Sequence, residues 1–114
     1  MCTFNQLNEI SNEVVTYYHD VYGDSLVSVI LYGSYARGDY DETSDIDIVA
    51  IAQGDRAMLQ ERLKEVWNKS FECGMNNDVI ISPTVIPLAE YEQYKDKLPY
   101  YRNINKEGKV LWMI

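Results

Sequence analysis

Residues 31–51 read LYGSYARGDYDETSDIDIVAI and contain the pattern on which the fold depends. A glycine and a serine, Gly33 and Ser34, are followed after ten residues by two aspartates, Asp45 and Asp47. Successive side chains of a strand point to opposite faces, so Asp45 and Asp47 are expected on one face where a strand begins. Two neighbouring carboxylates repel each other unless a cation neutralises them. The stretch is therefore either a solvated loop that runs into a strand or a metal site.

The residue types around the two aspartates favour the metal site. Mg²⁺ is commonly held by one or two carboxylates together with substrate phosphates. Gly33 lets the backbone approach an anion closely, Ser34 offers a hydroxyl, and a helix beginning here would add free N–H groups. Arg37 either reaches a phosphate or forms an ion pair with Asp39 or Asp41 alone, and both interpretations stay open.

The chain on either side of this stretch predicts a mixture of helices and strands. Residues 4–21 carry apolar side chains at helical spacing after a capping box formed by Thr3 and Gln6, and residues 58–71 repeat the pattern with Gly74 as the expected C-cap. Buried strands are expected at 25–32, 45–52 and 77–86. This order predicts an α/β or α+β domain with a small, mixed sheet flanked by helices.

The last third of the chain predicts short elements. Pro83 suggests that the third strand lies at an edge of the sheet or contains a bulge. A short helix is expected after Pro87 and a further helical turn before Gly108. The final residues, KVLWMI, are apolar enough to be tied to the body of the protein or to a partner.

Composition limits the class of protein. A length of 114 residues predicts one domain over residues 1–114. The net charge of -8 opposes general binding to nucleic acid. Cys2 and Cys73 are expected as free thiols, and the absence of a signal-peptide pattern predicts a cytoplasmic protein. No apolar run approaches the roughly 18 residues that a membrane span requires, so no membrane association is expected.

Two other phosphate- or metal-binding motifs are excluded by the sequence. A P-loop requires Gly-Lys followed by Ser or Thr, and the chain has no such triplet. An EF-hand loop that began at Asp39 would require glycine and glutamate at the positions that Ser44 and Ala50 occupy.

The spacing of Gly33-Ser34 and Asp45-Ile46-Asp47 resembles the G-S-x(10)-D-x-D signature of the nucleotidyltransferase fold, the DNA polymerase beta superfamily. The fuller string GSYARG…TSDIDI is similar to the minimal branch of that superfamily, the MNT domains. The resemblance extends from about residue 25 to about residue 109. It implies that Asp45 and Asp47 are catalytic residues that hold Mg²⁺ on the phosphates of ATP, and that Gly33 and Ser34 bind the β and γ phosphates.

The family resemblance also implies a third carboxylate on a neighbouring strand. Asp78 is the best match, because it opens the segment DVIISPTVI and no other acidic residue lies within a later strand. In this role Asp78 would help to bind the metal and activate the acceptor hydroxyl. The alternative interpretation is that Asp78 merely caps the end of a strand.

The size of the chain implies an acceptor for the transferred nucleotide. Stand-alone MNT proteins of this size resemble the antitoxin of HEPN/MNT toxin–antitoxin pairs, which adds AMP to a tyrosine of its HEPN toxin. The resemblance thus implies AMPylation of a HEPN-type toxin partner. Two alternatives stay open: a non-catalytic antitoxin or binding module that neutralises its partner by contact, and an adenylyltransferase that acts on a small molecule such as an antibiotic.

Overall fold

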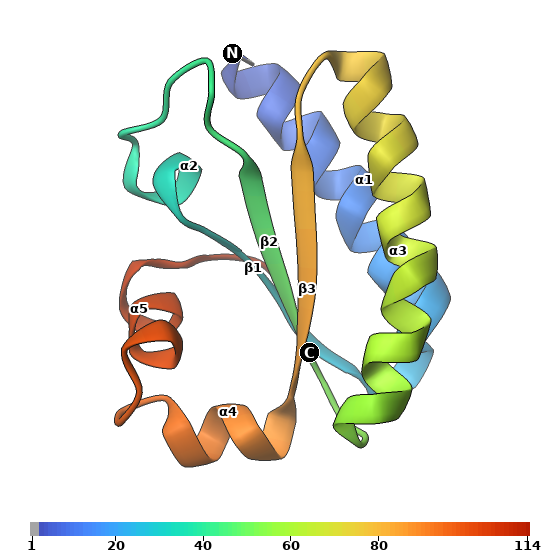
Figure 1. Cartoon of the computed structure of the whole chain (residues 1–114), viewed down its shortest axis with the longest axis vertical. Coiled ribbons are helices and arrows are strands. Elements are labelled where there is room, and N and C mark those ends of the chain that lie inside the picture. The colour runs from blue at the N-terminus through green and yellow to red at the C-terminus, as the bar shows by residue number, and fades with distance from the viewer. Residues whose placement is uncertain (1–2) are drawn as a thin grey trace.

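The computed structural model describes residues 3–114, which form a four-stranded sheet with helices on both faces (Figure 1). The elements, in chain order, are α1 (Phe4–Tyr22), η1 (Gly23–Ser25), β1 (Leu26–Tyr32), α2 (Ser34–Arg37), β2 (Ile46–Ala52), α3 (Arg56–Asn77), β3 (Ile81–Pro87), α4 (Leu88–Tyr94), α5 (Pro99–Glu107) and β4 (Lys109–Met113). The strand order is β3-β2-β1-β4, with β1 antiparallel to β2 and β4, and β2 parallel to β3. The predicted mixed sheet flanked by helices is confirmed.

Helices α1 and α3 cover one face of the sheet (Figure 1). Helix α1 starts with the predicted capping box, in which the Gln6 N–H donates to the Thr3 hydroxyl at 3.1 Å. Tyr18 of α1 is fully buried, and its hydroxyl donates to the carbonyl oxygen of Thr84 at 2.7 Å while lying 3.2 Å from that of Ile48. A single side chain of α1 therefore joins β2 and β3.

Helices α4 and α5 cover the opposite face, where a second apolar cluster lies (Figure 1). Its buried members come from three strands and one helix: Ile30, Val49, Ile51, Ile86 and Ile104. Because both faces are covered, β1 and β2 are almost continuously apolar, as the sequence predicts. No helix within residues 3–114 has the length and apolar character needed to cross a membrane.

The end of α3 differs from the prediction. The helix does not stop at Gly74 but continues to Asn77, and Asp78 is the C-cap in a left-handed conformation with φ 56° and ψ 44°. Gly74 is required for another reason, because a Cβ atom there would lie 2.6 Å from the carbonyl oxygen of Val79, where the chain turns back. The prediction that Asp78 opens a strand is therefore wrong, since β3 begins at Ile81.

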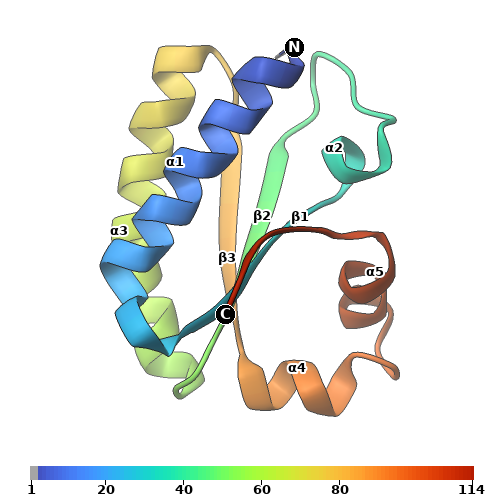
Figure 2. The ribbon, with the colours of Figure 1, turned by 180° about the vertical axis from the view of Figure 1, so that it is seen from behind.

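The two edges of the sheet agree with the sequence. Strand β3, which contains Pro83, lies at one edge, where a residue without an N–H is tolerated. Strand β4 pairs with β1 at the other edge, and Figure 2 shows the end of the chain beside β1. The apolar tail is thus tied to the body of the protein, which was one of the two predicted outcomes.

Candidate active site

The glycine-serine turn lies where β1 ends and α2 begins. Gly33 is the N-cap of α2, with φ 75° and ψ -155°, a conformation that is essentially restricted to glycine. A Cβ atom at Gly33 would lie 2.5 Å from Oδ2 of Asp47. The backbone of the turn therefore passes directly against the carboxylate of Asp47, and only glycine permits this approach.

Asp45 and Asp47 flank the first residue of β2, and both are half-buried. Burial raises the pKa of Asp47, and the adjacent carboxylate of Asp45 raises this pKa further. The structure thus brings Gly33, Ser34, Asp45 and Asp47 together at one end of the β1–β2 pair, as the sequence predicts. The repulsion between the two carboxylates is the condition that a bound cation would relieve.

Arg37 occupies the last position of α2 and forms two ion pairs on the surface. Its guanidinium lies 3.2 Å from a carboxylate oxygen of Asp39 and 3.7 Å from one of Glu107. The hydrogen bond with Asp39 raises the pKa of Arg37, and the positive charge of Arg37 lowers that of Asp47. The predicted ion pair with Asp39 is confirmed, the guanidinium also acts electrostatically on Asp47, and phosphate binding by Arg37 stays a prediction.

The acidic loop between α2 and β2 is held in shape by Asp41. One oxygen of Asp41 accepts hydrogen bonds from the N–H and hydroxyl groups of Thr43, at 2.8 and 2.7 Å. The N–H of Asp41 in turn donates to the Ser44 hydroxyl at 3.0 Å. Asp41 therefore fixes the turn that sets the spacing between the glycine-serine turn and the aspartate pair.

Within the described residues, the structure does not bring Asp78 together with Asp45 and Asp47 in a metal-binding cluster. Asp78 is exposed at the C-cap of α3, and its side chain lines a groove whose walls include neither Asp45 nor Asp47. Within residues 3–114, no three acidic, histidine or cysteine side chains come together in a way that could hold a metal ion. The predicted cluster of three carboxylates is reduced to the pair formed by Asp45 and Asp47.

The strands on either side of Asp47 contribute hydroxyl groups that the sequence did not reveal. Asp47 is paired with Tyr32 of β1 and with Ser82 of β3. Side chains alternate along a strand, so Ser82 and Thr84 lie on the face of Asp47. Burial raises the pKa of the Tyr32 phenol, whose hydroxyl is 3.2 Å from that of Tyr100 in α5. The pairing register of β2 and β3 would have identified Ser82 and Thr84 from the sequence. That register could not be predicted, because it requires knowing where β3 begins.

The residues at the site fit a magnesium ion that also binds a phosphate. The aspartate pair supplies oxygen ligands, which Mg²⁺ prefers, and two carboxylates leave positions for waters and phosphate oxygens. The absent side chain of Gly33 leaves space beside Oδ2 of Asp47 that a Cβ atom would fill. Helix α2 begins at Ser34, so its first turn follows directly on the Gly33 turn.

A glycine-serine turn against two carboxylates at the end of a mixed sheet is the arrangement that the nucleotidyltransferase resemblance predicts. The chain belongs to the nucleotidyltransferase domain family, whose model matches residues 7–111. It is therefore a nucleotidyltransferase by family.

One relative and two solved structures illustrate the similarity. A protein of Methanocaldococcus jannaschii named "Putative protein adenylyltransferase MJ0141" is 36% identical over 78 residues, which cover 68% of this chain and 77% of the relative. A crystal structure of a toxin–antitoxin with AMP-PNP has a TM-score of 0.57 at 20% identity. A mutant of the toxin–antitoxin MntA-HpeT has a TM-score of 0.56 at 18% identity. Each match covers 91% of this chain and 73% of the other, and both share its fold.

Proposed function

We propose that the protein transfers AMP from ATP to a hydroxyl group of another protein in a magnesium-dependent reaction. The observation that carries this proposal is the contact between the Gly33 turn and the carboxylate of Asp47, with Asp45 beside it. The name of the Methanocaldococcus jannaschii relative, which specifies protein adenylyltransfer, supports AMP as the transferred group. The AMP-PNP in a structure of the same fold supports ATP as the donor.

Each residue of the site has a separate role in this proposal. Asp45 and Asp47 hold Mg²⁺, while the backbone of Gly33 and the hydroxyl of Ser34 bind the β and γ phosphates. Arg37 exchanges its exposed partner Asp39 for a phosphate oxygen, which an exposed ion pair permits at little cost. When bound, Mg²⁺ supplies positive charge that stabilises the attacking and leaving oxygens. The protein thus contributes position and charge and forms no covalent intermediate.

The reaction exchanges one bond at the α-phosphorus for another. The oxygen of the acceptor hydroxyl forms a bond to the α-phosphorus, and the bond from that phosphorus to the bridging oxygen breaks. Pyrophosphate leaves, and the proton of the hydroxyl passes to water. The proposal gives Asp78 no part in this step, because Asp78 lines the groove beside α3 and forms no metal-binding cluster with the aspartate pair among the described residues.

The proposed acceptor is a tyrosine of a HEPN-type toxin, which makes the protein an antitoxin. The two structures with the same fold belong to toxin–antitoxin complexes, which supports a toxin partner. The net charge of -8 disfavours a nucleic-acid acceptor.

The proposal is tested by mixing the protein with Mg²⁺, ATP labelled at the α-phosphate and the product of the neighbouring reading frame. Label is expected on that product, and its mass is expected to rise by one or more AMP units. The double variant Asp45→Asn/Asp47→Asn is expected to lose transfer and Mg²⁺-dependent ATP binding. Asp24→Asn, an exposed aspartate outside the site, is the matched control and is expected to retain both.

Other outcomes of the same experiment would replace the proposal. Unchanged transfer and ATP binding in the double variant would show that the aspartate pair is not the site. A complex that forms without ATP and without a mass increase would favour an antitoxin that acts by contact. Label that appears on an added antibiotic, and not on the protein, would favour a small-molecule acceptor.

A further inference from the structure

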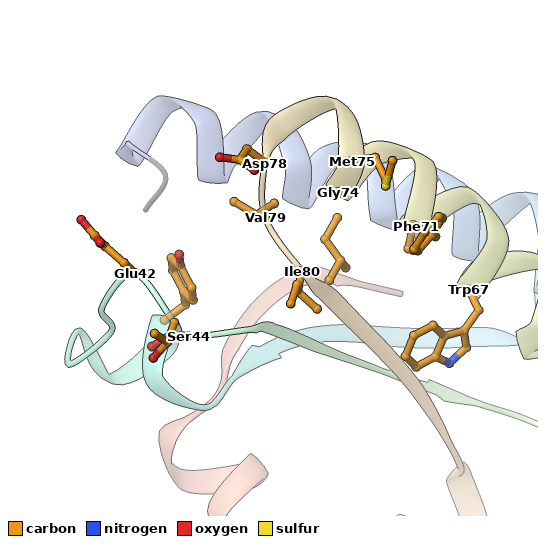
Figure 3. A pocket seen from close by; sticks show the side chains of 13 residues that line it. Glu42, Ser44, Trp67, Phe71, Gly74, Met75, Asp78, Val79 and Ile80 are labelled. Carbon is orange, nitrogen blue, oxygen red and sulfur yellow. The ribbon is translucent and has the colours of Figure 1, made fainter.

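A groove of about 670 Å³ lies between α3, the segment that enters β3 and the acidic loop (Figure 3). Neither the glycine-serine turn nor the aspartate pair contributes to its lining. It is therefore a feature separate from the candidate active site, and nothing in the proposed transfer reaction uses it.

One wall of the groove is an apolar stripe along α3. Trp67, Phe71 and Met75 follow one another at intervals of four residues and are 45%, 64% and 68% exposed. Ile80, just before β3, is 63% exposed and extends the same surface. Neighbouring large apolar side chains that remain in water mark a surface that another molecule covers.

The charges of the groove are all negative. Glu42 of the acidic loop and Asp78 are both exposed, and Figure 3 shows them at one end of the groove with Trp67 at the other. No lysine, arginine or histidine of the described chain lines the groove. Beneath the stripe, the fully buried hydroxyl of Ser70 has no hydrogen-bond partner within residues 3–114. The groove thus combines an apolar wall with an anionic end and an unused hydroxyl.

We propose that this groove binds an amphipathic helix of a partner protein whose apolar side chains are flanked by lysine or arginine. Apolar residues spaced by four along α3 form a ridge of the kind against which a second helix packs. Basic side chains of the partner would meet Glu42 and Asp78, which have no cation beside them in the groove.

The charges distinguish this partner from other occupants. A second copy of the chain would bring two further carboxylates and no lining cation to the interface, so like charges would face each other. A nucleotide would place its phosphates near Glu42 and Asp78, which repel them.

The position of the groove links this partner to the candidate active site. Ser44 lines the groove, and the next residue along the chain is Asp45. A helix in the groove would contact the loop that leads into the aspartate pair. The inference goes beyond the proposed transfer reaction and holds whether or not the docked protein is the acceptor.

The test uses the fluorescence of Trp67 in a Trp112→Phe background, so that Trp67 is the only tryptophan. The probe is a synthetic amphipathic helix with leucine on one face and arginine beside it, and the reference peptide carries glutamate in place of arginine. The basic peptide is expected to shift the emission of Trp67 to shorter wavelength and to bind about tenfold more tightly than the acidic one, with a difference that shrinks in high salt.

Two kinds of variant separate the apolar and charged parts of the groove. Phe71→Glu is expected to weaken binding of the basic peptide by about tenfold or more, whereas Phe4→Glu, on an exposed residue of α1 outside the groove, leaves binding unchanged. Glu42→Gln with Asp78→Asn is expected to remove most of the salt dependence. Because these side chains are exposed, the variants are expected to keep the thermal midpoint of the wild type. Measuring that midpoint verifies that the fold is retained.

Three results would overturn the inference. The first is equal binding of the basic and acidic peptides, or no binding of either. The second is binding of the basic peptide that Phe71→Glu does not change. The third is a wild-type dimer, seen by analytical ultracentrifugation, that Phe71→Glu dissociates, since the groove would then be an interface between two copies.

Discussion

Replacing Gly33 with alanine is expected to damage the candidate active site more than the fold. At φ 75° and ψ -155° the backbone cost of a side chain is about 1–3 kcal/mol. The new Cβ atom would also lie 2.5 Å from Oδ2 of Asp47, where ordinary contacts are 3.4–4 Å. The strand that carries Asp47 is paired on both sides, so the carboxylate has to rotate away. A displacement of about 1 Å at a reacting centre lowers rates by about 100-fold.

Gly38→Ala is the matched control for this variant. Gly38 also has a positive φ, 85°, but a Cβ atom there meets nothing within 4 Å. Its expected effect is a loss of about 1–2 kcal/mol in the free energy of unfolding, without a change in the site. Urea unfolding gives the stability of each variant, and calorimetry gives the affinity for ATP in the presence of Mg²⁺. The reasoning fails if Gly33→Ala binds Mg²⁺ and ATP as the wild type does, or if Gly38→Ala impairs binding equally.

Three further outcomes are expected. Asp47→Asn is expected to raise the thermal midpoint of the metal-free protein, because burial and Asp45 both disfavour the charged carboxylate. The same variant is expected to lose Mg²⁺-dependent ATP binding. A lower midpoint would contradict this reasoning. Tyr18→Phe is expected to lower the free energy of unfolding in urea by about 1–3 kcal/mol, because a buried hydrogen bond to β3 is lost. An effect no larger than that of Tyr17→Phe would count against this expectation. Burial, followed by Glu13, raises the pKa of the Cys73 thiol from 9.0 to about 11, so the folded state holds this proton more tightly than the unfolded state. The free energy of unfolding is therefore expected to decrease as pH rises from 9 to 11, with a smaller decrease in Cys73→Ala; equal slopes would refute the assignment.

The part of the site that the sequence predicts correctly depends on local spacing. Gly33, Ser34, Asp45 and Asp47 lie within one hairpin-like pair of strands, so their proximity follows once β1 and β2 are recognised. A close approach of the Gly33 backbone to an anionic group could also be expected from the sequence, because a turn that binds an anion leaves no room for a side chain.

The wrong prediction that Asp78 opens a strand has a different origin. The sequence shows an acidic residue before an apolar run, which is as compatible with a helix cap as with the start of a strand. Gly74 resembles a helix stop, but the structure uses it to let Val79 pass close to the helix, which is a tertiary contact without a local signal. Extending α3 to Asn77 moves the start of β3 and places Ser82 beside Asp47. A shift of a few residues in the boundary between α3 and β3 thus places Ser82, and not Asp78, next to Asp47 in the sheet.

The place of β4 in the sheet has a consequence for the order in which the protein can fold. Strand β1 is made early in synthesis, but one of its two partners, β4, consists of residues 109–113. Until the ribosome has released that segment, the outer edge of β1 presents unpaired N–H and C=O groups next to a hydrophobic face. A nascent chain therefore carries an unpaired strand edge until residues 109–113 have been made, and pairing over so long a sequence separation slows the closure of the sheet. Chaperones that bind extended hydrophobic segments would find their target in β1 during this interval.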